Sequence, residues 1–495
     1  MRRPTLSLSL ALGFMLVAGQ SALAANAFTT RVSPSAQMNA TEPSVAVDRS
    51  DGTIYIAWQA SGTHVARSDN GGRSFVQTPI NDPFGSDIGD VNIRVGGPTP
   101  CPTAATMTCL PGAHRVYVTS LEKLPLPLQT HLAYSDDRGA HWTINKVAAL
   151  NPSLIDRPWL AVYPSKDSAA SDKLYIAYHD FTISQIWVAT STDGGGSFGT
   201  TQSDVLVSDP DGQLNSFCNT IPSGIEVDPE TGEVYVQWIT AELQENVGQG
   251  CDITQIQNFH HVYMAHSSGA IGSGLAATTV WDVHSIFDGP MSTNTDKIFA
   301  TLAVDDSGTP GVGGNVYSVF PDNLAGPSVF DIWFTHSSNK GVSWAPPVKV
   351  NSDKGTHFFP WIAAGSTGRV DFIWYNSPDY TPTDAEQSPW YVTFAQTVNG
   401  TAAQPKFNQT AGSSSVIHVG GICTNGIFCS ISGGNRDLAD SISIAIDRGG
   451  SAALAYTDQG RVLNGPTWID YTCNTAQQSA VVGASSGLSC KGPAS

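Results

Sequence analysis

One repeating unit recurs along most of the 495-residue chain and limits what it can fold into. Each copy has a short apolar segment, a turn, and a second apolar segment that usually ends in an aromatic residue. The clearest copies are Pro43 to Asp48 with Ile54 to Trp58, Pro158 to Tyr163 with Leu174 to Tyr178, and Ser223 to Asp228 with Val234 to Trp238. Short apolar runs bounded by turn residues are typical of buried strands, so the unit predicts a repeated strand pair.

Four further copies of the unit are looser. They are Val91 to Val95 with Arg115 to Thr119, Ala300 to Asp305 with Val316 to Phe320, Pro360 to Ala364 with Val370 to Trp374, and Ser443 to Asp447 with Ala452 to Tyr456. One such unit cannot bury its apolar faces alone, so neighbouring copies are expected to stack into a single all-β domain.

A second motif, S-x-[DN]-x-G-x-[SH]-[FW], follows the strand pair in several units. It occurs at Ser68 to Phe75, Ser135 to Trp142, Ser191 to Phe198 and Ser337 to Trp344. The Asp or Asn side chain can accept backbone N–H bonds within a tight turn, and the Gly supplies backbone freedom. The motif is therefore expected to stabilise the turn, with its aromatic residue packed between strands, rather than to carry catalysis or calcium.

This octapeptide resembles the Asp-box, or BNR repeat, of bacterial sialidases and related β-propellers. The resemblance implies a propeller of four-stranded blades. Seven copies of the strand pair predict seven blades, and the six blades of sialidases are the alternative. The resemblance also implies hydrolysis of terminal sialic acids, but sialidases carry an aromatic-Arg-Ile-Pro motif whose nearest match here is Asp156-Arg157-Pro158-Trp159. No nucleophilic tyrosine is assigned.

The two ends of the repeat region predict how the ring closes. No outer strand is recognisable in the last unit after Tyr456, whereas Phe28 to Ser33 resembles the outer strand near Val348 to Ser352. We therefore predict that this N-terminal segment pairs beside the strands of residues 443–456, which removes exposed sheet edges. In the sixth unit, Ser415 to His418 is the expected outer strand.

The start of the chain has the features of a signal peptide. Two arginines precede a mostly apolar run from Leu6 to Ala18, and Ala22-Leu-Ala24 provides small residues for cleavage. The apolar run is shorter than the ~20 residues that span a bilayer. The predicted organisation is a signal peptide at 1–24, a propeller at 25–475 and a polar tail at 476–495, in a secreted or periplasmic protein.

Charge narrows the range of partners. Removal of the signal peptide takes away two arginines and no acids, which moves the formal net charge from −18 to −20. A surface this acidic repels phosphate backbones and anionic lipid, so neither nucleic acid nor membrane insertion is expected. The expected ligand is a carbohydrate or glycoconjugate, and the expected state is a monomer.

The eight cysteines predict disulfides rather than a metal site. They form four sequence-local pairs: Cys101 with Cys109, Cys218 with Cys251, Cys423 with Cys429, and Cys473 with Cys490. An even count in an exported chain favours disulfides, although eight cysteines allow 105 pairings. The acidic loop from Asp82 to Asp90 could offer oxygen ligands to calcium but lacks EF-hand spacing, so no metal or cofactor is predicted.

Polar residues gather where the loops of a propeller share one face, just before each inner strand and just after each second strand. Those before the inner strands are Glu42, Arg94, Asp156, Arg157, Asn219, Asp296, Lys297, His357, Arg436, Asp437 and Asp440. Those after the second strands are His179, Asp180, Glu242, Asp322 and Asp379. Ligands of propellers generally bind at this face, near the central channel.

One unit supplies the catalytic candidates. Asp156, His179 and Asp180 combine carboxylates with an imidazole, which suits general acid–base chemistry. The predicted substrate-binding residues are Arg157, Glu42, Arg94, His357 and Asp437. Two alternatives stay open: Asp156 and Arg157 could pair to plug the channel, and the propeller could bind a glycan or protein at the cell surface without catalysis.

Overall fold

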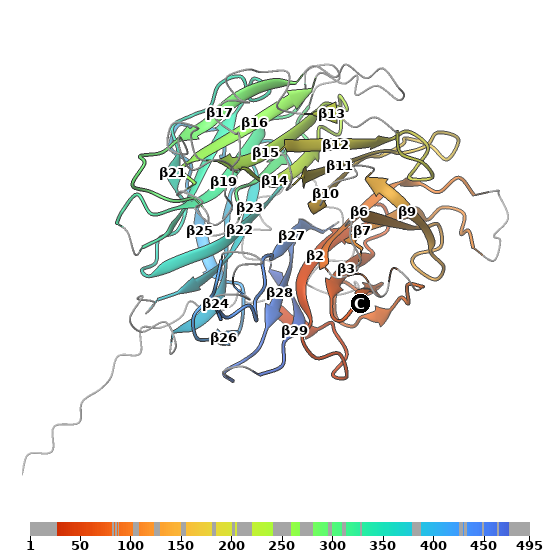
Figure 1. The fold of residues 1–495 in the computed structure, drawn as a ribbon, viewed down its shortest axis with the longest axis horizontal. Helices are drawn as coiled ribbons and strands as arrows, with labels where there is room; N and C mark the ends of the chain where they lie inside the picture. The colour runs from red at the N-terminus through yellow and green to blue at the C-terminus, as the bar shows by residue number, and fades with distance from the viewer. Residues whose placement is uncertain are drawn as a thin grey trace, which may run out of the picture.

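Seven four-stranded antiparallel sheets surround a central axis in the computed structural model, which makes the chain a seven-bladed β-propeller (Figure 1). The predicted fold class and blade number are confirmed. The structure describes residues 27–474 except 82–83, 85–86, 88, 102–107, 123–128, 150–154, 181–184, 200–202, 205–219, 241–258, 268–280, 296–298, 309–312, 327–328, 379–387, 425–428, 430–432, 448–449 and 463–464. None of the described segments is a helix that could span a membrane.

The first six blades each take consecutive strands, from the channel outward. Blades 1 to 3 are β2 (Thr41–Val47), β3 (Ile54–Gln59), β4 (Thr63–Ser68) and β5 (Val76–Gln77); β6 (Gly89–Pro98), β7 (His114–Leu121), β8 (Thr130–Ser135) and β9 (Thr143–Ala149); and β10 (Ile155–Tyr163), β11 (Lys173–Asp180), β12 (Gln185–Ser191) and β13 (Ser203–Asp204). Blades 4 to 6 are β14 (Thr220–Val227), β15 (Val234–Thr240), β16 (His261–Ser267) and β17 (Asp282–Asp288); β18 (Thr301–Val304), β19 (Val316–Asp322), β20 (Asp331–Ser337) and β21 (Val348–Lys349); and β22 (Thr356–Ala364), β23 (Val370–Ser377), β24 (Pro389–Thr397) and β25 (Asn408–Ala411).

Blade 7 joins the two ends of the chain. It contains β27 (Ser443–Ile446), β28 (Ala452–Asp458), β29 (Trp468–Asn474) and, outermost, β1 (Phe28–Arg31). The register places Phe28 opposite Cys473 and Arg31 opposite Asp470. The predicted closure by the N-terminal strand is confirmed, but its direct neighbour is β29, a third strand that the sequence analysis did not recognise.

The outer strand of the sixth blade is not the segment that was predicted. The outer strand is β25, whereas the predicted segment contributes only His418 to a short additional strand, β26 (His418–Val419), which pairs with the start of β24. Ile417 and His418 are both buried, as the residues of a blade strand are, but their backbone pairs with Trp390 near the start of β24, whereas β25 pairs with the later residues of that strand.

Burial across the blades explains why the repeat is apolar. The second strands lie between neighbouring blades, and every residue of β15 and β19 is buried. Strands buried on both faces read as continuous apolar runs. Outer strands such as β9 and β17 mix exposed polar residues with buried apolar ones, which explains why they are harder to recognise.

The octapeptide turns show the expected structural role. In blade 2, the Ser135 hydroxyl donates to Asp137 Oδ1 at 2.9 Å and accepts from the Gly139 N–H at 2.7 Å, and the His141 N–H donates to Asp137 Oδ1 at 2.8 Å. The corresponding bonds occur in the turns that begin at Ser68, Ser191 and Ser337. Gly139 has φ of +83°, a conformation that favours glycine.

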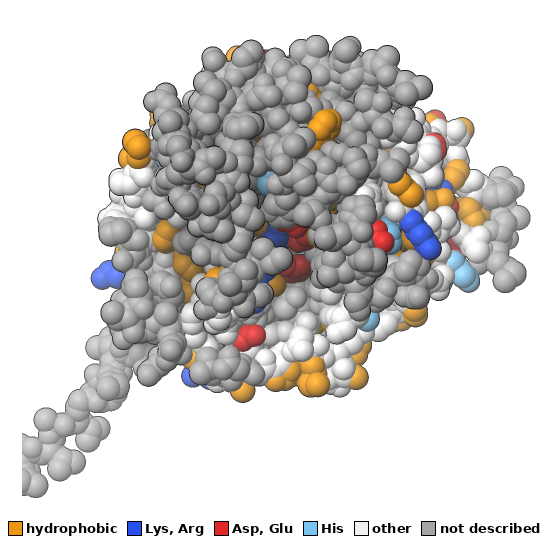
Figure 2. All heavy atoms as spheres, in the orientation of Figure 1, with side chains coloured by type: hydrophobic (Ala, Val, Ile, Leu, Met, Phe, Trp, Pro, Cys, Tyr) orange, Lys and Arg blue, Asp and Glu red, His pale blue; other side chains and the backbone are white. Residues whose placement is uncertain are grey.

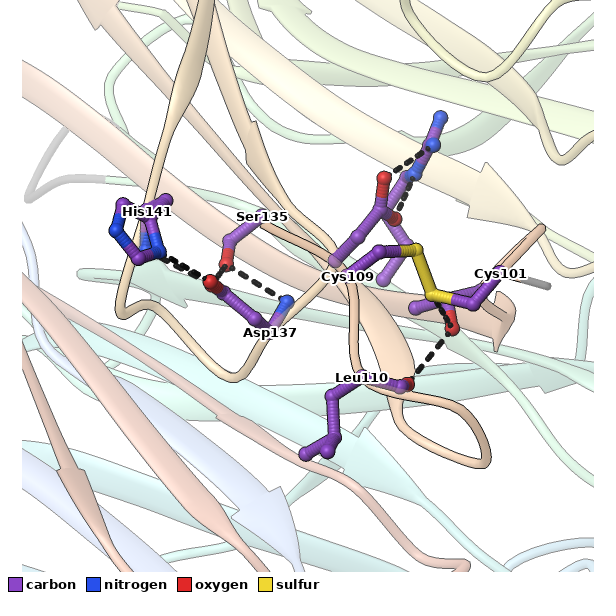
Figure 3. Close-up of a disulfide and its surroundings, with 9 residues drawn as sticks. Cys101, Cys109, Leu110, Ser135, Asp137 and His141 are labelled. Atoms are coloured by element: carbon purple, nitrogen blue, oxygen red, sulfur yellow. Dashed lines mark hydrogen bonds and ion pairs between the residues drawn. A yellow bond between two sulfur atoms is a disulfide. The ribbon is translucent and has the colours of Figure 1, made fainter. Parts of the chain in front are cut away.

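A disulfide lies against one of these turns (Figure 3). Cys101 bonds Cys109, and the Leu110 N–H donates to the Asp136 carbonyl at 2.9 Å, which holds the disulfide loop beside the blade 2 turn. Cys423 bonds Cys429 as predicted, and Cys473 is also disulfide-bonded. Cys218, Cys251 and Cys490 lie outside the described residues, as does the predicted tail at 476–495.

Candidate active site

The same backbone irregularity occurs near the start of several inner strands. Pairing with the second strand is interrupted between Thr41 and Ser44, between Gly89 and Asn92, and between Asp156 and Trp159. The residues inside these bulges, Glu42, Asp90 and Arg157, have φ of 53°, 51° and 55°. Bulges redirect side chains, and left-handed conformations in non-glycine residues are costly and cluster at functional sites. Blades 1, 2 and 3 therefore each direct one charged side chain to the mouth of the channel.

Arg157 connects three blades at this point. Its Nη1 donates to Asp90 Oδ1 of blade 2 at 2.7 Å, and its Nη2 donates to Asp440, which precedes β27 of blade 7. Its Nε lies 4.0 Å from Asp156 Oδ2. The guanidinium carbon also lies 4.9 Å from the centre of the Phe299 ring. Every nitrogen of this guanidinium therefore faces a carboxylate of the protein.

Two more residues complete the group. The Asp90 N–H donates to Glu42 Oε2 at 3.0 Å, and Arg436 donates to Asp440. We call the six residues the mouth cluster: Glu42, Asp90, Asp156, Arg157, Arg436 and Asp440. Figure 2 shows acidic and basic side chains together near the middle of this face.

Environment separates the carboxyl groups into two kinds. Burial, reinforced by the negative charge of Asp90, raises the pKa of Glu42 from 4.5 to about 7. Burial and Asp90 also raise the pKa of Asp156 well above its ordinary range. Burial opposes ionisation of Asp440 as well, but the guanidinium groups of Arg157 and Arg436 outweigh it and lower the pKa of Asp440.

These shifts balance the charge of the mouth cluster. Four carboxylates facing two guanidinium groups would leave two uncompensated negative charges in a poorly solvated place, which is costly. The two carboxyl groups with raised pKa, Glu42 and Asp156, remove that excess when both hold a proton.

A small pocket opens beside the cluster. Its walls combine Glu42, Asp90 and Arg157 with Trp159 and Trp361. The two indole rings lie 5.2 Å apart, centre to centre. Trp361 is partly exposed, whereas Phe358 and Phe359 are buried in the core. Carboxyl groups therefore adjoin an aromatic surface of a kind on which the apolar face of a sugar ring can pack.

His179 and Asp180 approach the cluster through strand pairing. On β11, His179 lies directly opposite Asp156, and Asp180 lies opposite Ile155. Residues directly opposite in an antiparallel pair project from the same side of the sheet, so His179 and Asp156 share one face of blade 3. His179 is 7% exposed.

The side chains of the other predicted ligand-binding residues contact protein groups outside the cluster. Arg94 Nη2 contacts Glu226 Oε1 of blade 4 at 3.3 Å. His357 is fully buried, with Nδ1 2.7 Å from the Phe330 carbonyl and Nε2 3.1 Å from Asp353 Oδ1. Asp437 accepts from Gln459 Nε2 at 2.6 Å. The remaining polar candidates at Asn219, Glu242, Asp296, Lys297 and Asp379 lie outside the described residues.

Sequence reasoning did not assign roles to Asp90 and Asp440, which hold Arg157 in place. Asp440 was visible as a polar residue before an inner strand, but its partner lies 283 positions away along the chain. Asp90 ends the acidic loop considered for calcium. The useful signal was the position of each residue relative to its own inner strand, because Glu42, Asp90 and Arg157 occupy equivalent bulges.

No protein-family model and no curated protein sequence matches the chain. Solved structures similar to it include an α-L-arabinanase of Penicillium chrysogenum, with 9% identity over 92% of this chain and 98% of that one and a TM-score of 0.44. A sialidase of Streptococcus pneumoniae shows 8% identity over 90% and 70%, with a TM-score of 0.40. A polysaccharide lyase, an ulvan lyase, shows 8% identity over 91% and 94%, with a TM-score of 0.46.

Proposed function

We propose that this protein is an exported enzyme that acts on carbohydrate at the mouth of its channel, by general acid–base chemistry of the kind used in glycoside hydrolysis. The observation that carries the proposal is the mouth cluster, in which four carboxyl groups adjoin two guanidinium groups beside a pocket lined by two tryptophans. A glycosidase needs one protonated carboxylic acid and one ionised carboxylate at the scissile bond. The raised pKa of Glu42 and the lowered pKa of Asp440 support such a difference within the cluster.

Glu42 is the proposed proton donor, because it lines the pocket and has a pKa of about 7. A catalytic acid works best when its pKa lies near the working pH. Asp156 is the second proton-carrying group, and His179 across the strand pair is proposed to orient it. Asp180, the next residue on β11, is proposed to assist the same acid–base chemistry.

Arg157 takes a different role in this proposal from direct substrate binding. Its nitrogens already face Asp90, Asp156 and Asp440, so it keeps the carboxylates together and sets their charge. Trp361 and Trp159 are proposed to contact the sugar ring. The substrate-binding roles predicted for Arg94, His357 and Asp437 receive no support from their contacts, which are with other protein groups.

A second candidate function is a propeller that binds glycan or protein without catalysis. The saturation of Arg157 by protein carboxylates favours it, because a closed charge network can serve as a plug of the channel. In that case the partly exposed Trp361 and its neighbours would be the binding surface. Export to an oxidising compartment is part of both proposals and is supported by the two described disulfides.

Turnover and binding assays of the purified protein with a panel of glycosides and polysaccharides, including sialosides, distinguish the two functions. For the enzyme, we expect turnover of at least one substrate, with a loss of about 10²- to 10⁴-fold in Asp156→Asn. The matched control is Asp137→Ala, which removes an octapeptide carboxylate and should lower the melting temperature without reducing turnover. Binding without turnover, abolished by Trp361→Ala, would support the non-catalytic function instead.

A further inference from the structure

A second group of potential ligand side chains lies on blade 4, away from the mouth cluster. His260 immediately precedes β16, and His261 is its first residue. Strand pairing sets His261 directly opposite Asp288, the last residue of β17. One ligand atom from each of these three residues lies within 4.8 Å of the other two. The two imidazole rings are 4.0 Å apart, centre to centre.

Hydrogen bonds between His260 and Gly289 hold the potential ligand side chains in positions suited to binding a metal ion. His260 Nδ1 lies 2.8 Å from the Gly289 carbonyl, to which it donates, so Nε2 is the nitrogen that would ligate a metal ion. Metal-bound histidines commonly donate their other N–H to a carbonyl in this way. The Gly289 N–H donates back to the His260 carbonyl at 2.8 Å, which fixes the turn that holds Asp288.

Burial and exposure also suit a bound ion. Both histidines are 2% exposed, whereas the Asp288 side chain is 73% exposed, so an ion can reach the site from solvent on the carboxylate side. His261 Nδ1 lies 3.1 Å from Asp288 Oδ1. Ligand atoms around a tetrahedral zinc ion are about 3.3 Å apart, so this pair already has the required separation.

We propose that His260, His261 and Asp288 bind a divalent transition-metal ion, with zinc as the best match. Two imidazoles and one carboxylate form a typical zinc ligand set, whereas calcium and magnesium prefer oxygen ligands alone. Three protein ligands would leave the fourth position of a tetrahedral zinc ion open to a water molecule.

Metal titration of the whole protein tests the proposal. Protein treated with a chelator and dialysed should bind one zinc ion, measured by calorimetry, and should develop the visible absorption of Co²⁺ with nitrogen and oxygen ligands. Asp288→Asn should weaken zinc binding by at least about 100-fold, beyond the 10–100-fold that outer-shell changes cost. Its side chain is exposed, so the variant should fold.

The matched control is His284→Ala on the same blade. His284 Nε2 lies 2.9 Å from Asp282 Oδ2 on β17, which gives a histidine–carboxylate pair that does not belong to a three-ligand group among the described residues. This variant should keep full zinc affinity, whereas His261→Ala should lose it. Absence of stoichiometric zinc binding by the wild type would overturn the proposal. Equal weakening in His284→Ala and Asp288→Asn would also overturn it, by showing binding to surface pairs.

Discussion

Arg157 Nη1 lies 2.7 Å from Asp90 Oδ1, although the two residues belong to different blades and to different copies of the repeat. Both side chains leave the backbone from bulges with φ near 50°. Their ion pair therefore depends on a backbone conformation that two inner strands adopt independently. It also joins two neighbouring blades, 2 and 3.

Removing the arginine should destabilise the propeller strongly. In Arg157→Gln, the carboxylates of Asp90 and Asp440 lose their shared cation in a poorly solvated place. Breaking a buried ion pair from one side costs about 3–5 kcal/mol, and urea denaturation should show a fall of that size in the free energy of unfolding.

The control for that experiment is Arg49→Gln. Arg49 and Asp306 also form a short ion pair, at 2.6 Å, but their side chains are 56% and 40% exposed. Loss of an exposed pair should cost less than about 1 kcal/mol. Equal effects of the two substitutions would mean that the mouth cluster is as well solvated as the surface.

The raised pKa of Glu42 predicts a specific dependence of stability on pH. The folded chain holds this proton up to about pH 7, whereas the unfolded chain releases it near its ordinary pKa of 4.5. The stabilising contribution is complete below about pH 4.5 and is lost as the pH rises to about 7. Glu42→Gln should remove this pH dependence, which for a shift from 4.5 to about 7 is on the order of 3 kcal/mol.

Urea denaturation of wild type and Glu42→Gln at pH 5 and pH 8 measures that difference. Burial also raises the pKa of Asp458 to about 7, so the informative quantity is the change between the two proteins rather than the wild-type curve alone. Parallel pH dependence in wild type and variant would show that Glu42 ionises normally in the folded protein.

Closure by the first strand should be essential for the stability of blade 7. Arg31 on β1 bonds Asp470, lies 3.5 Å from Asp458, and stacks 4.6 Å from the Trp468 ring. Deletion of residues 28–31 would expose the edge of β29 and is expected to lower the melting temperature and cause concentration-dependent association. Arg31→Ala, which keeps the strand, should cost only about 1 kcal/mol because Arg31 is 43% exposed.

Light scattering together with thermal denaturation distinguishes the two variants. The deletion variant could instead stay monomeric and have the same melting temperature as Arg31→Ala. In that case the backbone pairing of β1 contributes little to stability, and β29 alone closes the ring.

The blade framework could be predicted because it depends on local patterns. Each second strand is buried between two blades, so Ile54 to Trp58 and Val234 to Trp238 read as uninterrupted apolar segments. Strand β29, the third strand of blade 7, has no such uninterrupted segment. In it, Asp470, Thr472 and Asn474 alternate with apolar residues. A polar connection separates it from Tyr456, which hid the third strand of blade 7.

The candidate site was only partly predictable. Its position before the inner strands follows from propeller topology, and this identified Glu42, Asp156 and Arg157. Backbone conformation decides which of these polar residues reach the channel, and the bulge at Asp90 has no distinct sequence signal. His261 and Asp288 become neighbours only through the register of β16 and β17, so no motif spacing indicated them.

The turnover of Glu42→Gln is the most direct test of the proposed chemistry. On the substrate that the carbohydrate panel identifies, the account predicts a loss of about 10²- to 10⁴-fold at pH 7, because glutamine cannot donate the proton that Glu42 holds. The melting temperature at that pH should not fall, since the variant removes a buried ionisable group. Wild-type turnover in Glu42→Gln would contradict the assignment of the mouth cluster as the acid–base site.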